Sequence, residues 1–179
     1  MKLPLLITSV FILAVGGWLL ISNTGQHQDM SNMGSSASKE PARQAPDFSL
    51  QDYNGKTVRL ADFAGTPVVI NSWAAWCPFC GKELADFATA QKEFGDRVVI
   101  VAVDRSETRD VAKTYTDELG VTDDLVFLLD PSDSFYQSIG GFSMPETMFV
   151  DKQGVITVQK RGPMDIQEIR EKIQRLISS

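Results

Sequence analysis

The two cysteines of this sequence are its residues best suited to chemistry, because only two residues separate them. They lie in the motif Trp76-Cys77-Pro78-Phe79-Cys80. A cysteine reacts as its thiolate, and a helix N-terminus stabilises negative charge. The motif follows an apolar segment and opens a helical one, so we expect Cys77, in the first helical turn, to be the attacking nucleophile. Cys80 lies one turn later on nearly the same face, where it can resolve a mixed disulfide.

Other uses of a cysteine pair fit this sequence less well. Two cysteines cannot build the disulfide framework of a small secreted fold. A structural zinc site needs four ligands, usually Cys and His, and the only histidine, His27, lies far from both cysteines. A pair of inert buried cysteines is a further alternative, which the change from strand to helix at the motif disfavours. We therefore expect no metal site and no organic cofactor.

The segments around the motif predict strands that alternate with helices, followed by a hairpin and a last helix. Apolar runs and turn residues indicate the strands, and helical periodicity indicates the helices. The expected elements are a hairpin at 48–60, strands at 67–72, 97–103 and 126–129, helices at 80–94, 107–119, 132–139 and 165–177, and a second hairpin at 147–158. This order implies an α/β fold with a mixed sheet.

The N-terminal part of the sequence predicts an anchor and a tether before the folded domain. Residues 1–22 are uncharged after Lys2, as in a transmembrane signal-anchor, and the next basic residue is Lys39. This asymmetry places the rest of the chain on the extracytoplasmic side of the cell membrane. Residues 23–44 are polar and lack a hydrophobic period, which predicts a flexible tether. The folded domain is expected at 45–179.

A cleaved signal peptide is the alternative to an anchor. Ala14 and Gly16 offer a small-x-small cleavage pattern, but cleavage there leaves the apolar residues 18–21 at the mature end. With cleavage, the protein is secreted instead of anchored.

The composition is that of a globular protein, with 43% hydrophobic and 22% charged residues. The net charge of -6 gives no counterion release on a polyanion, so a nucleic-acid partner is disfavoured.

The stretch NSWAAWCPFCGKE, residues 71–83, resembles the thioredoxin superfamily, and more closely its TlpA/ResA-like, membrane-anchored branch. That branch includes the thioredoxin-like proteins of cytochrome c maturation. The resemblance extends over the domain, through the insert between Val103 and Val126, the Met144-Pro145 turn and FVDKQG at 149–154. It implies a thioredoxin-like fold whose mixed central sheet is flanked by helices, with an N-terminal β-hairpin and a central α/β insert.

The resemblance also implies a surface that binds substrate. Pro145 corresponds to a cis-proline that faces the cysteines, although most X-Pro bonds are trans. Met144 then lies beside the disulfide, where a soft side chain suits a peptide groove. Trp76 is expected to cover the disulfide, and the apolar Phe79 to be exposed to protein substrates. Pro78 suits the start of a helix, because its missing N–H is not needed there.

Glu83 is the third candidate for a catalytic role. The family pattern has a partly buried Glu at this spacing from the second cysteine, and burial raises the pKa of a carboxyl so that it can exchange protons with a thiol. Thioredoxins use a buried Asp on the preceding strand instead, and here Asn71 takes that position. The sequence has Ala85 where the family often has a helix-kinking Pro, which puts the burial of Glu83 in doubt. The alternative is a solvated charge like Glu93.

Three aspartates outside the motif are interpreted as structural. Asp52, Asp62 and Asp104 are expected to be cap and turn residues and not catalysts.

These features together predict reversible dithiol–disulfide exchange with protein substrates and with a second membrane or extracytoplasmic thiol protein. The resemblance favours a reductant, and an oxidant that installs disulfides in exported proteins is the main alternative. A thiol peroxidase is a further alternative, but it typically needs a Thr shortly before its reactive cysteine, where residues 74–76 are Ala-Ala-Trp. A redox-inert peptide-binding module is disfavoured by the two intact cysteines.

Overall fold

The computed structural model of the chain describes residues 43–178. The predicted anchor at 1–22 and nearly all of the predicted tether at 23–44 lie outside this range. None of the helices within 43–178 has the length and apolar character that crossing a membrane requires.

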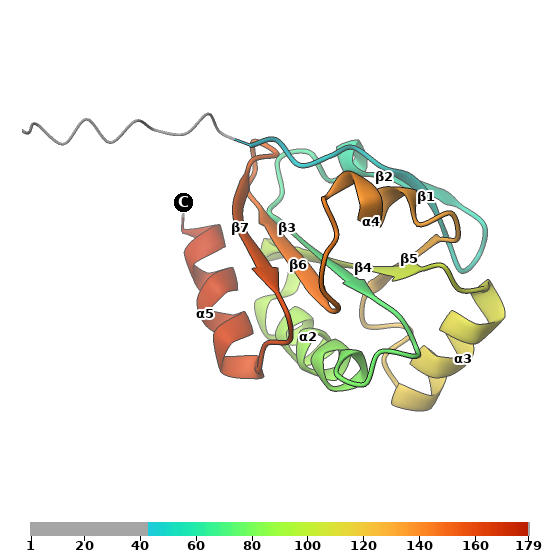
Figure 1. Cartoon of the computed structure of the whole chain (residues 1–179). Coiled ribbons are helices and arrows are strands. Elements are labelled where there is room, and N and C mark those ends of the chain that lie inside the picture. The colour runs from blue at the N-terminus through green and yellow to red at the C-terminus, as the bar shows by residue number, and fades with distance from the viewer. Residues whose placement is uncertain (1–42, 179) are drawn as a thin grey trace, which may run out of the picture. The chain divides into compact units, whose positions relative to one another are not determined.

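A mixed sheet of seven strands runs through the described part of the chain, in the order β2-β1-β5-β4-β3-β6-β7 (Figure 1). The strands are β1 (Ser49–Asp52), β2 (Thr57–Arg59), β3 (Val68–Trp73), β4 (Val99–Arg105), β5 (Val126–Asp130), β6 (Glu146–Val150) and β7 (Ile156–Arg161). The central strands β3, β4 and β5 are parallel, and the outer strands pair antiparallel. This arrangement confirms the predicted thioredoxin-like fold.

The helices cover both faces of the sheet, which explains the apolar runs of its central strands. They are α2 (Cys80–Phe94), α3 (Arg109–Leu119), α4 (Ser134–Ser138) and α5 (Ile166–Ile177), with short 3-10 turns η2 (Leu60–Phe63) and η3 (Gly95–Arg97). Figure 1 shows α2, α3 and α5 on one face of the sheet and α4 on the other, with the β1–β2 hairpin forming one edge of the sheet. Every residue of β3 is buried as a result.

Two apolar layers hold the helices to the sheet. On one face, α2 and α5 bury Phe87, Ile169 and Ile173 against side chains of β3, β4 and β6. On the other face, Phe135 of α4 packs with Phe48 and with apolar residues of the same strands. Fixing β3 and α2 on this core fixes the segment that joins them, which contains Cys77.

Helix α3 begins and ends, and helix α5 begins, at residues whose types favour these positions. The Thr108 hydroxyl accepts a hydrogen bond from Val111 N at the start of α3, and the Asp165 carboxyl accepts one from Glu168 N at the start of α5. Gly120 ends α3 with a φ of 69°, a conformation that glycine adopts without strain. Each predicted helix and strand is present, with ends displaced by a few residues.

Candidate active site

The cysteines lie in a turn between β3 and α2 and form a disulfide, with their Cα atoms 5.4 Å apart. α2 begins at Cys80, so the expectation that Cys77 lies in its first turn is wrong. The reason is local: Cys80 N donates to Cys77 O at 3.2 Å, which makes Pro78 and Phe79 the centre of a tight turn. Cys77 therefore precedes the helix, still on the side of its positive N-terminal end.

Aromatic side chains flank the disulfide on the surface. Trp76 is 59% exposed and Phe79 57% exposed, while both cysteines are buried. The exposure of Phe79 confirms the prediction for that residue. Trp73 is fully buried and stacks on Tyr115, so it belongs to the core.

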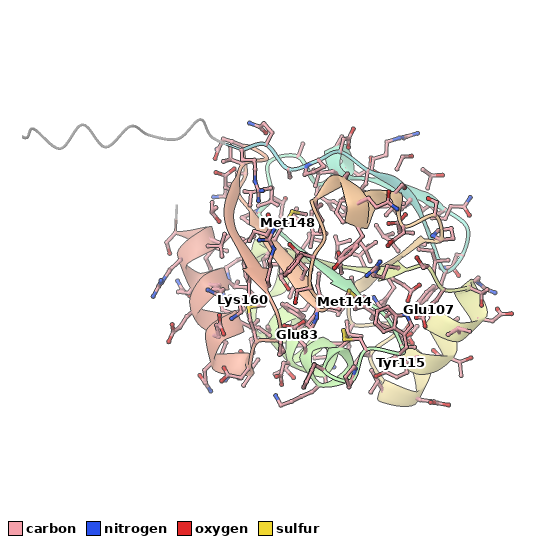
Figure 2. All side chains as sticks on the ribbon, in the orientation of Figure 1. Glu83, Glu107, Tyr115, Met144, Met148 and Lys160 are labelled. Carbon is pink, nitrogen blue, oxygen red and sulfur yellow. A yellow bond between two sulfur atoms is a disulfide. The ribbon has the colours of Figure 1, made fainter. Side chains whose placement is uncertain are left out.

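The Met144–Pro145 peptide bond is cis, as the family resemblance implied. Met144 packs against the apolar cluster that contains both cysteines. Glu146, two residues after Met144, pairs with Ser72 at the end of β3, and Figure 2 shows Met144 between Glu83 and Glu107. The turn before β6 thus lies beside the disulfide.

Glu83 is buried one helical turn after Cys80, with a side chain that is 1% exposed. Its carboxylate accepts hydrogen bonds from Asn71 Nδ2 at 2.9 Å and from Met164 N at 2.8 Å. The same Asn71 amide donates to Thr147 Oγ1 at 2.9 Å, which links the carboxylate to β6. The burial predicted for Glu83 is therefore confirmed, despite Ala85.

Burial raises the pKa of Glu83 from 4.5 to about 7, and the hydrogen bonds from Met164 and Asn71 only partly offset this rise. At neutral pH, this carboxyl can therefore hold a proton or release one. Asn71 contributes to the site by orienting the Glu83 carboxyl. The sequence did not indicate this role, because an asparagine side chain does not titrate. Met164 was missed because it is 81 residues away from Glu83 and contributes only its backbone N–H.

Two of the three aspartates expected at caps and turns are found in such positions. Asp52 accepts hydrogen bonds from Asn54 N and Lys56 N in the β1–β2 turn, and Asp62 accepts one from Arg59 N. The expectation for Asp104 is wrong, because it is a fully buried residue of β4. Its neighbours on β3 and β5, Trp73 and Leu129, cover it on both sides.

Arg105 is a residue of the site that the sequence did not single out. Its guanidinium lies over the Trp76 ring at 5.9 Å and over the Tyr136 ring at 3.8 Å. It also pairs with Asp133 through hydrogen bonds of 2.8 and 2.5 Å. Tyr136 in turn donates its hydroxyl to Ser143 O at 2.9 Å, so these contacts connect the Trp76 turn with the Met144–Pro145 turn.

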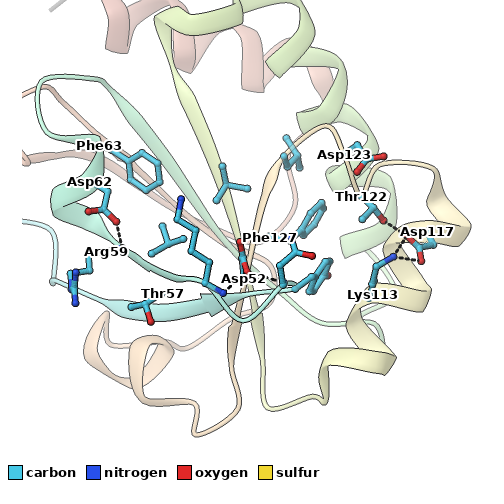
Figure 3. Close-up of a pocket in the computed structure, with 16 residues that line it drawn as sticks. Asp52, Thr57, Arg59, Asp62, Phe63, Lys113, Asp117, Thr122, Asp123 and Phe127 are labelled. Carbon is cyan, nitrogen blue, oxygen red and sulfur yellow. Dashed lines mark hydrogen bonds and ion pairs between the residues drawn. The ribbon is translucent and has the colours of Figure 1, made fainter.

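One hollow in the described part of the chain lies away from the disulfide. It has a volume of about 830 Å³ and lies between the β1–β2 hairpin and the segment that joins α3 to β5 (Figure 3). Lys56 and Arg59 line it from the hairpin, and Lys113 and Asp117 from α3, where they pair with each other. Neither cysteine lines this hollow.

A smaller hollow of about 420 Å³ lies beside the active-site turn. Ala75 lines it together with Val111 and Tyr115 of α3. Tyr115 also packs against the apolar cluster that contains both cysteines.

The comparison with known proteins agrees with this geometry. A sequence model of the AhpC/TSA family matches residues 41–159. The chain belongs to the AhpC/TSA family. Within it, the chain is 32% identical to thiol:disulfide interchange protein DsbE of Allochromatium vinosum over 136 residues, which cover 75% of this chain and 74% of that protein. It is 26% identical to thiol-disulfide oxidoreductase ResA of Bacillus thuringiensis over 140 residues, which cover 76% of this chain and 79% of that protein.

A solved structure supports the fold of this AhpC/TSA family member. The crystal structure of a DsbE-type protein from Chlorobium tepidum superposes with a TM-score of 0.70 at 24% identity, over 76% of this chain and 96% of that one. Fold, relatives and cysteine pair together identify a thiol-disulfide oxidoreductase of the DsbE/ResA type. The TlpA/ResA-like resemblance of the sequence is thereby confirmed.

Proposed function

We propose that the protein reduces disulfides in protein substrates on the extracytoplasmic side of the membrane, as in cytochrome c maturation. The Cys77 thiolate attacks a substrate disulfide, which forms a mixed disulfide and releases one substrate thiolate. Cys80 then attacks Cys77 Sγ, which releases the second substrate thiol and closes the Cys77–Cys80 disulfide. Two electrons pass to the substrate, and a membrane or extracytoplasmic thiol protein restores the dithiol.

The buried Glu83 carboxyl is the observation that carries the reductive direction. A negative charge close to a thiol disfavours its ionisation, so the reduced form of the site is poorly stabilised. Protein oxidants have the opposite property, a strongly stabilised reduced form. Arg105, the cation that contacts Trp76, is paired with Asp133, which compensates its charge. These charges support a reductant over an oxidant.

We assign proton transfer to Glu83. Its pKa of about 7 lets it accept the proton of the Cys80 thiol when that sulfur attacks, and return the proton to a leaving thiolate. One turn of α2 separates Glu83 from Cys80, and Asn71 and Met164 orient the carboxylate.

We assign substrate binding to the residues that surround the disulfide. Trp76, Pro78 and Phe79 present exposed surface on one side, and Met144 and Pro145 form the turn on the other. Exposed aromatic rings supply apolar contact to a partner protein. An extended substrate segment between these two turns brings its disulfide to Cys77.

The reduction potential of the Cys77–Cys80 pair tests the direction. Equilibration of the full chain with a glutathione or dithiothreitol redox buffer should give a value near that of thioredoxin, about -270 mV. A value of about -120 mV, in the range of a strong oxidant, would contradict the reductive role and support an oxidative one. Turnover of insulin disulfides with dithiothreitol, without turnover of hydrogen peroxide, would separate the exchange activity from a peroxidase.

The location belongs to the same proposal and has its own test. Alkaline carbonate should leave the full chain in the membrane pellet, because an apolar anchor resists extraction where a peripheral protein does not. A reporter fused after Ser179 should be active only outside the cytoplasm. Release by carbonate would argue against the anchor, and a reporter active in the cytoplasm would reverse the orientation.

A further inference from the structure

Asp104 is a buried acidic residue for which the exchange reaction gives no role. Its side chain is fully buried at the end of β4, one strand away from the segment that leads to Cys77. Neither of its carboxyl oxygens has a hydrogen-bond partner within normal geometry among the described residues. An ionised carboxylate in such a place is strongly disfavoured, because burial removes its hydration without a replacement.

The carboxyl of Glu107 is the group that interacts most strongly with the Asp104 carboxyl. Glu107 is half-buried, and its Oε2 accepts a hydrogen bond of 2.7 Å from Ala75 N in the active-site turn. Two interacting carboxyl groups can form a hydrogen bond only if one of them carries a proton, because an ionised carboxylate only accepts hydrogen bonds. In Figure 2, Glu107 lies near the start of α3, on the other side of Met144 from Glu83.

The surroundings decide which of the two carboxyls keeps the proton. Glu107 Oε2 already accepts the Ala75 N–H, which leaves its other oxygen to accept a second hydrogen. For Asp104, burial and then the neighbouring Glu107 carboxyl raise the pKa well above the usual range, and a hydrogen bond from the Glu107 backbone offsets this rise only in part. The other groups around the pair are the acidic Asp130 and Asp117 and the Tyr53 hydroxyl, and Arg109 of α3 donates to Tyr53 O.

We propose that Asp104 is protonated and donates its hydrogen to the Glu107 carboxylate, and that this carboxyl pair holds the Ala75 N–H and so positions the turn that carries Cys77. Asp104 is thus a positioning residue that acts through Glu107. The bond fixes the far side of the active-site turn, opposite the side that Glu83 and Asn71 hold. It also explains how the Asp104 carboxyl, whose oxygens accept no hydrogen bond of normal geometry, is tolerated inside the sheet.

The proposal makes the stability of the protein depend on pH through the Asp104 proton, and variants of the carboxyl pair separate this contribution from that of other groups. The unfolded chain loses the Asp104 proton near pH 4, whereas the folded protein keeps it to a much higher pH. Over that interval the folded state holds one proton more, so rising pH favours unfolding. Urea unfolding of the full chain in mild detergent measures this effect.

In Asp104→Asn the amide donates the same hydrogen bond without a titrating proton. The unfolding equilibrium constant of the wild type should therefore rise relative to this variant by up to tenfold per pH unit above about pH 4. Glu107→Gln should remove the same dependence, because its amide can donate to an ionised Asp104 and its oxygen can still accept from Ala75. Asp110→Asn, a change at a carboxylate that is 91% exposed on α3, is the matched control and should keep the wild-type slope.

The positioning itself is measured at Ala75. Asp104→Leu removes the donor to Glu107, so the Ala75 amide should exchange its hydrogen at least tenfold faster, while Asp104→Asn should leave this rate unchanged. Two results would overturn the proposal. One is a dependence of unfolding on pH in both Asp104→Asn and Glu107→Gln that equals that of the wild type. The other is an Ala75 amide that exchanges its hydrogen equally fast in Asp104→Leu and Asp104→Asn. These measurements involve no substrate, so they stand or fall separately from the proposed reductive function.

Discussion

At the scale of single residues, the site depends on carboxyl groups that are kept away from water. Glu83 and Asp104 are both buried, on the two sides of the segment that leads to Cys77. Glu83 receives two hydrogen bonds and titrates near neutral pH. Asp104 has no partner of normal geometry apart from the proton it is proposed to share. One carboxyl therefore suits proton exchange during turnover, and the other suits a fixed structural contact.

Replacing Glu83 by Gln should acidify Cys77. The change is nearly isosteric and keeps a hydrogen-bonding group, but it removes a negative charge close to the thiols. The Cys77 pKa should fall, and alkylation of the reduced protein at pH 7 should accelerate roughly threefold to tenfold. Product release should slow, because the proton acceptor is lost. An alkylation rate profile against pH that matches the wild type would rule out electrostatic coupling between Glu83 and Cys77.

The roles of the two cysteines predict an asymmetry in trapping. Cys80→Ser leaves the attacking thiol without its resolving partner, so mixed disulfides with substrate proteins should accumulate through Cys77. Cys77→Ser should trap few or none. A non-reducing gel of the two variants after exposure to a disulfide-containing protein gives the comparison, and the opposite pattern would exchange the two roles.

At the scale of elements, the two active-site turns are held together through Tyr136 of α4. Its hydroxyl binds Ser143 O, and the Arg105 guanidinium lies over its ring. Gly141 passes so close to this ring that any Cβ there would overlap it. The Tyr136 ring has little freedom to move aside without giving up these contacts.

Gly141→Ala should therefore disturb the turn before β6. We expect a loss of stability of about 1–3 kcal/mol, as for overpacking in a core, together with a higher KM for protein substrates. Urea unfolding and insulin turnover provide the two measurements. Gln137→Ala, at an exposed position of α4, is the control and should change neither quantity. Normal stability and KM in Gly141→Ala would mean that Tyr136 does not couple the turns.

The elements and the central groups of the site were predictable from the sequence and its family resemblance, but several contacts that support the site were not. Apolar runs and helical periodicity indicate β3, β4 and α2, because these elements bury whole faces. Glu83 could be placed by its helical phase together with the family resemblance. Asp104 could not, since an acidic residue at the end of an apolar run looks like a turn residue until strands cover it on both sides. The Met164 N–H and the contacts of Arg105 depend on tertiary packing, which no local pattern encodes.

At the scale of the whole molecule, the buried Glu83 also sets a pH dependence of stability. Its pKa is 4.5 in an ordinary setting and about 7 in the folded protein, so between these values the folded state holds a proton that the unfolded state lacks. Stability is therefore highest below this window and is lost as the pH rises through it. The loss amounts to about 3 kcal/mol at most.

Unfolding of Glu83→Gln between pH 4 and pH 8 should lack this contribution. Its free energy of unfolding should fall less than that of the wild type by about 3 kcal/mol over the window. Glu118→Gln, at an exposed position of α3, serves as the control. Parallel curves for the wild type and Glu83→Gln would show that the two states bind the Glu83 proton equally well.

Both ends of the described chain leave the fold at the same side. Ala45 N binds Gly154 O in the β6–β7 turn, and Ser178 lines a hollow together with Pro67 and Lys152. These residues lie by the start of β3, whereas the disulfide follows its end, roughly 20 Å away along a six-residue strand. A fluorescent protein or a biosensor surface joined to the C-terminus should therefore leave the catalytic face clear, even for a bulky partner. The fold thus offers a ready attachment point for watching single exchange events.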